Sequence, residues 1–163
     1  PTPAREAATV APAGIAHVHV LAAMHAACFE ERWSVDAVTE VMAGPGVFAF
    51  IAQADGDGGH ELAPMGFAIA RIVGEDSELL SLGVVPGGRR RGIARQLVTA
   101  VLRRASERGA RQIFLEVAED NFAAQHLYRF YGFRLVGRRP DYYRRVGGGA
   151  IAALTLRRNL VVE

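Results

Sequence analysis

The sequence predicts a single mixed α/β (α+β) domain, and three observations support this prediction. The chain has 163 residues, half of them hydrophobic and 22% charged, which suits one compact core and argues against intrinsic disorder. Helical periodicity alternates with short β-rich runs along the chain. A strand, a helix and a strand between residues 78 and 117 imply a parallel crossover, which we expect to be right-handed. We therefore expect one domain over residues 1–163, with the order of residues 1–13 left open.

The periodicity and the turn residues place each element in order. Ser34 can cap a helix that ends near Gly44-Pro45, and Gly109 and Gly132 mark the ends of two later helices. Residues 55–59 are typical of a turn. Helices are expected over 15–28, 35–43, 92–108 and 121–131, and strands over 47–54, 65–73, 78–85, 113–117, 133–138 and 150–156.

Composition excludes several classes of protein. The only cysteine, Cys28, excludes an internal disulfide framework and favours a reducing compartment. His17, His19 and His25 match no usual ligand spacing, so we expect no metal site. Residues 7–29 lack charged side chains, but a proline, a glycine and three histidines interrupt them. We therefore expect no membrane segment and a cytoplasmic protein.

Charge is divided along the chain. Residues 1–85 carry a net charge of −8 and residues 86–163 a net charge of +10, and all nineteen basic residues are arginines. The basic half suits a phosphate-bearing ligand, whereas the acidic half suits a cationic one. The arginines are spread over helices and turns, which is typical of a solvated surface. We therefore expect no direct contact with nucleic acid.

The segment from Leu80 to Arg95 holds the clearest ligand-binding pattern. A strand ends in a turn of glycines and arginines that opens directly onto an amphipathic helix. A helix start offers unpaired backbone N–H groups and a positive dipole end, and Gly92 and Ala94 let a pyrophosphate approach the main chain. The pattern is neither a Walker loop nor G-x-G-x-x-G, so the residues alone leave a phosphate site and an ordinary basic helix start both open.

Two segments together resemble the GNAT N-acetyltransferases. Arg89-x-x-Gly92-x-Ala94 is similar to the family's acetyl-CoA signature, R/Q-x-x-G-x-G/A, and residues 115–133 are similar to its second half. Further details resemble the RimI branch, the ribosomal-protein-alanine N-acetyltransferases: Cys28-Phe29, Trp33-Ser34, Leu115-Glu116-Val117, Arg138-Arg139 and Tyr142-Tyr143. The resemblance covers residues 14–156. It implies the GNAT fold, a mixed and mostly antiparallel sheet of six to seven strands with helices on both faces.

The resemblance implies direct transfer of an acetyl group from acetyl-CoA to an amine, without a metal. Such a reaction needs a base for the amine, a donor for the oxyanion and an acid for the departing thiolate. Glu116 matches the family's base. From the residues alone, a structural carboxylate bonded to backbone or to an arginine is the alternative. Tyr128 matches the acid, with a core aromatic beside Tyr131 and Phe133 as the alternative.

The resemblance also implies where the coenzyme binds. The backbone of Leu82, Gly83 and Val84 would pair with pantetheine like an added strand, and the Val84 N–H would bind the oxyanion. Asn121 would bind the pantetheine arm, cap the following helix, or do both. The pyrophosphate would be held by the turn and helix start: Arg89, Arg90, Arg91, Gly92, Ile93, Ala94 and Arg95.

The acceptor implied by the resemblance is a protein N-terminal amine, an alanine of a small-subunit ribosomal protein. Phe29 and Trp33 would line its groove or simply anchor two helices, and Tyr142 and Tyr143 would contact the peptide or lie at a strand edge. Asp141 lengthens the spacing before the tyrosine pair by one residue, and the hairpin 144–150 lacks the family's usual acidic residue. Two alternatives stay open: acetylation of a lysine side chain or small amine, and a non-catalytic acyl-CoA sensor.

Overall fold

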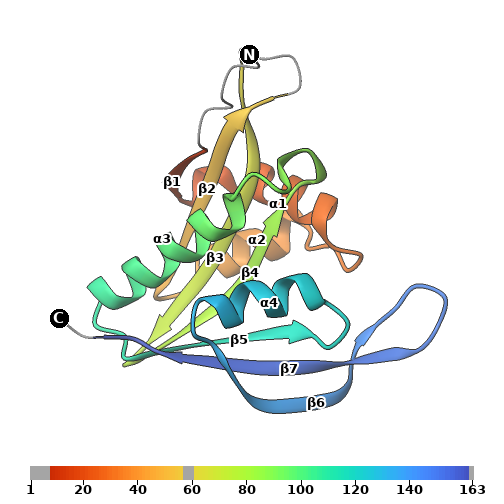
Figure 1. The fold of residues 1–163 in the computed structure, drawn as a ribbon. Helices are drawn as coiled ribbons and strands as arrows, with labels where there is room; N and C mark the ends of the chain where they lie inside the picture. Colours follow the sequence, from red (N-terminus) through yellow and green to blue (C-terminus); the bar gives the residue numbers. More distant parts are fainter. Residues whose placement is uncertain (1–7, 57–60, 162–163) are drawn as a thin grey trace, which may run out of the picture. The chain divides into compact units, whose positions relative to one another are not determined.

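A computed structural model describes residues 8–56 and 61–161 of the chain (Figure 1). Seven strands, four α-helices and two short 3-10 helices are found within these residues. In chain order they are β1 (Thr9–Ala13), η1 (Ile15–His17), α1 (Val18–Cys28), α2 (Val35–Met42), β2 (Val47–Asp55), β3 (Leu62–Val73), β4 (Asp76–Val84), η2 (Pro86–Gly88), α3 (Ile93–Glu107), β5 (Gln112–Ala118), α4 (Phe122–Phe130), β6 (Arg134–Arg144) and β7 (Ala150–Asn159).

The strands form one mixed sheet in the order β1-β2-β3-β4-β5-β7-β6. β1 pairs antiparallel with β2, and β7 pairs antiparallel with both β5 and β6. β4 and β5 are parallel, and their register joins Asp76–Leu79 to Gln112–Leu115, although both strands continue beyond it. The predicted fold class and the predicted parallel crossover are therefore confirmed.

The chain divides into two compact units. Unit 1 contains Pro1–Ala70 and Ser81–Val101, and unit 2 contains Arg71–Leu80 and Leu102–Glu163. β3, β4 and α3 contribute residues to both units. The predicted phosphate turn lies in unit 1, whereas Glu116 and Tyr128 lie in unit 2.

Neighbouring residues of β3 show how helices cover both faces of the strands in unit 1. A Cβ placed on Gly66 would lie 2.9 Å from Ile93 and 3.1 Å from Leu97, so α3 packs on that face. The next residue, Phe67, is fully buried, and its ring centroid lies 6.0 Å from that of His25 on α1. Successive residues of a strand point to opposite faces, which places α3 and α1 on opposite sides of β3 (Figure 1).

The structure corrects several predicted boundaries. Thr9–Ala13 form a strand that the sequence pattern does not predict, β3 begins at Leu62 and β6 extends to Arg144. The first turn of the predicted helix over 15–28 is a 3-10 turn. Residues 1–7, and most of the predicted turn at 55–59, lie outside the described residues. Among the helices described, none is both long and apolar enough to cross a membrane.

Candidate functional site

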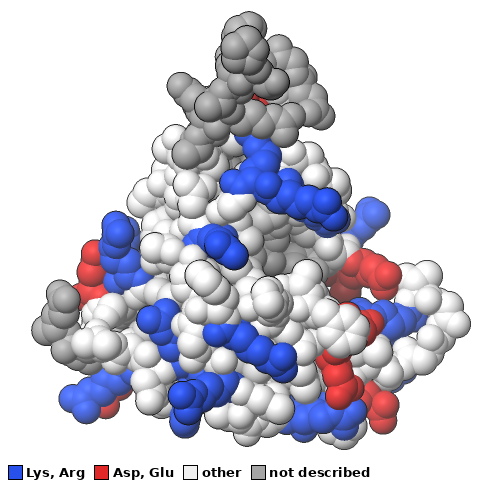
Figure 2. All heavy atoms as spheres, in the orientation of Figure 1, with Lys and Arg blue, Asp and Glu red and all other residues white. Residues whose placement is uncertain are grey.

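The turn between β4 and α3 in unit 1 has the backbone geometry of an anion-binding loop. Arg90 and Gly92 have φ values of +60° and +75°. The Gln96 N–H donates to the Gly92 carbonyl oxygen at 3.2 Å, so α3 begins directly at the turn. A helix start presents backbone N–H groups that i→i−4 bonds do not use. Figure 2 shows basic side chains gathered over this turn. A phosphate group fits such a loop, because it accepts from backbone N–H groups beside the positive end of the helix dipole.

Two arginines of the turn are also held by the protein itself. Arg89 Nε donates to the carbonyl oxygen of Val84 at 3.3 Å, and Arg91 Nη1 donates to the carbonyl oxygen of Asp55 at 3.1 Å. The Arg91 contact ties the turn to the end of β2. Arg90 and Arg95 are exposed, whereas Ile93 is buried and anchors the helix start. The predicted coenzyme residues therefore have different roles, since some shape the turn and others extend into solvent.

Gly83 allows the end of α1 to approach β4 closely. A Cβ at this position would lie 2.8 Å from the Phe67 ring and 2.9 Å from Cys28 Sγ. Burial raises the pKa of the Cys28 thiol, and the positive charge of Arg89 only partly opposes this shift. Cys28 is therefore a packed thiol at neutral pH and not an activated nucleophile.

His25 organises the segment between α1 and α2, a role that the sequence pattern does not predict. Its ring stacks on Trp33 with centroids 4.6 Å apart and contacts Phe29 at the same centroid distance. Its Nδ1 accepts from the Trp33 backbone N–H at 3.2 Å. Burial lowers the pKa of His25 to about 4. The structure therefore brings Phe29 and Trp33 together on one neutral, buried ring, with Phe29 37% exposed.

Glu116 lies on β5 in unit 2, on the half-exposed face of that strand. Ile113, Leu115 and Val117 are buried, whereas the alternate residues are partly exposed. The predicted strand is therefore buried on one face only, which explains how a carboxylate fits in this apolar run. The side chain of Glu116 is 23% exposed, and its Oε1 lies 3.2 Å from Nε of Arg139.

The Glu116–Arg139 pair crosses β7, because the strand order places β7 between β5 and β6. Glu116 of β5 pairs with Thr155 of β7, which in turn pairs with Gly137 of β6. Arg139 of β6 pairs with Ala153, two residues from Thr155 on the same face of β7. Ala153 presents only a methyl group, so the long arginine side chain can pass over β7 to reach the carboxylate. The alternative left open by the sequence, a carboxylate paired with an arginine, is thus present in the structure.

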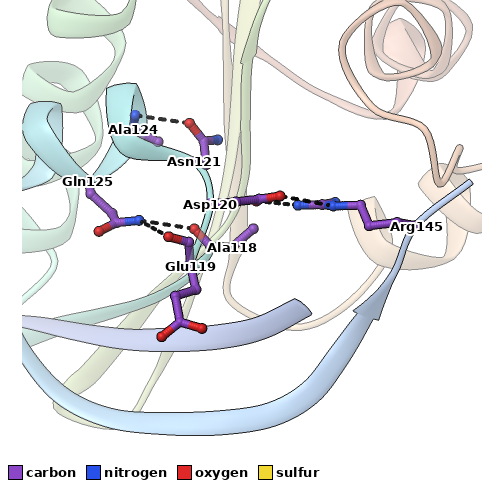
Figure 3. Close-up of polar contacts among 7 residues, drawn as sticks. All are labelled: Ala118, Glu119, Asp120, Asn121, Ala124, Gln125 and Arg145. Atoms are coloured by element: carbon purple, nitrogen blue, oxygen red, sulfur yellow. Dashed lines mark hydrogen bonds and ion pairs between the residues drawn. The ribbon is translucent and has the colours of Figure 1, made fainter. Parts of the chain in front are cut away.

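Two further arginines of β6 and its hairpin pair with acids that follow β5. Arg138 makes a two-point contact with Glu119, at 2.9 Å for both hydrogen bonds. Arg145 makes a two-point contact with Asp120 (Figure 3). The Arg138 contact lowers the pKa of Glu119. Three acid–arginine pairs therefore join the hairpin to the β5–α4 segment within unit 2.

Tyr128 lies on α4 and is only 7% exposed. Its ring meets Phe133 edge-on at 5.6 Å, so the core packing that the sequence left as an alternative is observed. Burial raises the pKa of the Tyr128 hydroxyl well above its usual range, and Tyr143 acts in the same direction. The hydroxyl therefore keeps its proton at neutral pH, which is the state required of an acid.

Asn121 caps α4, which is the alternative role that the sequence left open beside coenzyme binding. Its Oδ1 accepts from the Ala124 N–H at 3.1 Å (Figure 3). Gln125, one turn along, donates from Nε2 to the carbonyl oxygens of Ala118 and Glu119 and so fixes the strand–helix junction. With the oxygen used in the cap, the amide NH2 of Asn121 is the group that can serve a ligand.

The extra residue Asp141 is absorbed as an irregularity in β6. Arg139 is level with Ala153 and Tyr143 with Ile151, so three residues of β6 lie opposite one of β7. Asp141 has a φ of +55°. The ring of Tyr142 meets that of Tyr143 edge-on, and the Arg139 guanidinium lies 5.5 Å from the Tyr142 ring centroid. The hairpin turn that follows contains Gly147, Gly148 and Gly149, all with positive φ.

The described part of the chain contains no group of three or more metal-ligating side chains. His17, one of the three early histidines, instead accepts from the Gly14 N–H through Nδ1. The sequence does not predict which arginine pairs with Glu116, although the Arg138-Arg139 motif signals two candidates. No local pattern signals the role of His25.

The protein has a mixed α/β fold in which β4 and β5 are parallel. A turn that contains glycines and arginines joins β4 to the start of α3. The chain belongs to the acetyltransferase (GNAT) family, whose model matches residues 18–133. This confirms the family that the two sequence segments resemble.

Two relatives agree with that assignment, and a solved structure shares the fold. A "[Ribosomal protein bS18]-alanine N-acetyltransferase" from Haemophilus ducreyi is 35% identical over 77 residues, 47% of this chain and 53% of that protein. An "N-alpha-acetyltransferase RimI" from Mycobacterium tuberculosis is 44% identical over 82 residues, 50% of this chain and 48% of that protein. The chain thus spans about half the length of these curated relatives. The crystal structure of the Escherichia coli ribosomal-protein-S18-alanine N-acetyltransferase superposes with a TM-score of 0.83 at 22% identity, covering 96% of both chains.

Proposed function

We propose that this chain transfers an acetyl group from acetyl-CoA to the N-terminal α-amine of a protein, an alanine of a small-subunit ribosomal protein. The proposal rests on two residues of this chain that match the pattern of the family. Glu116 and Tyr128 match the RimI-type pattern and lie inside the region matched by the family model. The names of the relatives at 35% and 44% identity support the same acceptor class. Such an acceptor would place the reaction in the cytoplasm.

In the proposed reaction, the turn Arg89–Arg95 holds the pyrophosphate of acetyl-CoA. The backbone of Leu82–Val84 and the amide NH2 of Asn121 bind the pantetheine arm. The bound coenzyme supplies the thioester that is attacked. These roles suit the residues, because the turn offers backbone N–H groups and exposed arginines, whereas the Asn121 oxygen is used in the helix cap.

The chemical step moves three protons, because the acceptor nitrogen loses two and the departing sulfur gains one. An α-ammonium group has a pKa of about 7.7–8.0, so a base must take its proton before the nitrogen attacks. Glu116 takes that proton, directly or through water, and the nitrogen forms a bond to the thioester carbonyl carbon. The Val84 N–H stabilises the oxyanion. The C–S bond then breaks as Tyr128 gives its proton to the departing thiolate. The second proton of the nitrogen restores the Tyr128 hydroxyl, directly or through water, and the proton held by Glu116 is released to solvent.

Acceptor profiling tests the proposal. A basic peptide with a free N-terminal alanine and an internal lysine is compared with its N-blocked copy, and the modified site is located by mass spectrometry. We expect acetylation of the free α-amine alone. Acetylation of the blocked peptide would move the activity to side-chain amines, and coenzyme binding without turnover on any amine would favour a sensor.

The same assay tests the two residues. We expect Glu116→Gln and Tyr128→Phe each to lower kcat by about 10²–10⁴-fold, the usual contribution of a general base or acid. The dissociation constant of acetyl-CoA should change by less than about twofold in both variants. If coenzyme affinity and turnover fall together, the residue is structural.

A further inference from the structure

We propose that Arg139 occupies the position of the acceptor's cationic amine in the acceptor-free protein, and that the acceptor displaces it from Glu116. This inference rests on the proposed function, since it assigns Glu116 to the amine. It makes Arg139 a determinant of acceptor affinity that neither the family match nor the names of the relatives assign.

The first argument is the chemistry around the guanidinium. Arg139 Nε lies 3.2 Å from the Glu116 carboxylate, and the same group lies 5.5 Å from the Tyr142 ring centroid. A carboxylate beside an aromatic face is a recognition site for a cation. The α-ammonium of a protein N-terminus is such a cation, and it must approach Glu116 to transfer its proton directly. Arg139 therefore stands where the acceptor amine has to go.

The second argument is that the Arg139–Glu116 contact can be broken at little cost in free energy. Arg138 and Arg145 each make two hydrogen bonds to their acid, whereas the Arg139–Glu116 pair is an ion contact of 3.2 Å from Nε to Oε1. The Arg139 side chain is also 62% exposed, so water can solvate it after displacement. Exchange of one cation for another leaves the charge beside the carboxylate unchanged. Exposed ion pairs of this kind contribute little, so an acceptor with further contacts can replace the arginine.

The third argument is the irregularity in β6. In a regular strand, residues three apart point to opposite faces, so Arg139 and Tyr142 would not meet. Here three residues of β6 lie opposite one of β7, and Asp141 takes a φ of +55°. The extra length brings the Tyr142 ring, 48% exposed, beside the Arg139 guanidinium. Asp141, the extra residue relative to the RimI spacing, therefore lets the Tyr142 ring form the aromatic part of the proposed cation site.

Steady-state kinetics of Arg139→Met with a free-alanine peptide test the proposal. Arg138→Met is the matched control, because it removes the same charge from the neighbouring residue of the same strand. We expect Arg139→Met to lower the KM for the peptide by about two- to fivefold with kcat nearly unchanged, and Arg138→Met to leave the KM unchanged. Equal changes in both variants, an unchanged KM, or a lower kcat at constant KM in Arg139→Met would overturn the proposal.

A direct readout uses NMR of the arginine Nε–H groups in the CoA-bound protein, with the Arg139 signal identified by its loss in Arg139→Met. Addition of the free-alanine peptide should shift the Arg139 signal and not that of Arg138, and the N-blocked peptide should shift neither. An unchanged Arg139 signal on binding of the free peptide overturns the proposal. If the wild type acetylates no peptide, the proposed function fails, and the signal's response to the free amine still decides whether Arg139 is displaced.

Discussion

At the scale of single residues, the candidate site combines structural and chemical roles in the same side chains. Asn121 caps α4 through its oxygen and keeps its NH2 for a ligand, and Tyr128 packs on Phe133 while its hydroxyl stays protonated. The packing and capping alternatives weighed from the sequence are therefore present in the structure. They are compatible with the proposed catalytic roles, because different atoms serve each.

Two substitutions at Asn121 separate its roles. Asn121→Asp keeps an oxygen for the Ala124 N–H and places a negative charge at the helix start, so its stability should match the wild type. Asn121→Ala should lose about 1 kcal/mol of unfolding free energy. If the NH2 binds pantetheine, both variants should bind acetyl-CoA more weakly. Urea unfolding and coenzyme titration measure the two effects, and unchanged affinity in Asn121→Asp would limit the residue to the cap.

At the scale of elements, close packing fixes the positions of the strands and loops that carry the site. Gly83 lets α1 pack against β4, and His25 holds the segment between α1 and α2 through its ring and Nδ1. Neither residue is proposed to touch the reacting atoms. Both keep backbone or aromatic groups in the positions that ligands would meet.

Two glycine variants test the packing at β4. In Gly83→Ala the new methyl group would lie within 3 Å of the Phe67 ring and Cys28 Sγ, so the chain must shift and lose about 1–3 kcal/mol of unfolding free energy. Gly87 has no neighbour within 4 Å of an added Cβ, so Gly87→Ala should stay within about 0.5 kcal/mol of the wild type. Equal stability of the two variants would show that α1 does not require the glycine.

Acid should destabilise the protein partly through His25. Burial holds its folded-state pKa at about 4, below the usual 6.5, so the unfolded chain takes up a proton first as the pH falls. The stability contributed by neutral His25 is complete above pH 6.5 and is lost as the pH falls towards 4. Thermal unfolding between these limits should therefore depend less on pH in His25→Asn than in the wild type. The exposed His19→Asn serves as control, and identical pH slopes in all three proteins would contradict this prediction.

The sequence was a good guide to elements and a poor guide to contacts between them. Periodicity and caps predicted the four described α-helices and six of the described strands, because those signals are local. β1 was missed because Thr9–Ala13 contains a proline and two alanines, and its strand character comes from pairing with β2. The Arg139–Glu116 pair depends on the strand order, which places β7 between β5 and β6 and cannot be read from local spacing.

At the scale of the whole molecule, the division of charge along the chain bears on both proposed substrates. Acetyl-CoA is anionic, and its proposed turn lies in the basic half, whereas a ribosomal-protein acceptor is basic and suits the acidic half. Long-range attraction of this kind raises encounter rates and weakens as salt is added. Glu30 and Glu31 are exposed next to Phe29, in the acidic half.

Salt dependence tests the acceptor side of this argument. The KM of a basic peptide should rise between about 50 and about 500 mM salt, whereas that of a neutral peptide of equal length should change little. The double variant Glu30→Gln/Glu31→Gln should raise the KM of the basic peptide at low salt and flatten its salt dependence. A salt response identical to that of the wild type would exclude these two carboxylates from acceptor attraction.

The turn between β6 and β7 has a consequence for how this protein can vary. Gly147, Gly148 and Gly149 have φ values of +90°, +97° and +89°, and a Cβ added to any of them would meet no atom within 4 Å. The constraint at these three positions is therefore the left-handed backbone conformation and not a lack of space for a side chain. This backbone is one that D-amino acids adopt readily and L-amino acids resist. An ordinary substitution at the hairpin tip therefore strains the backbone, whereas a change in loop length can alter the contacts of the hairpin without that cost.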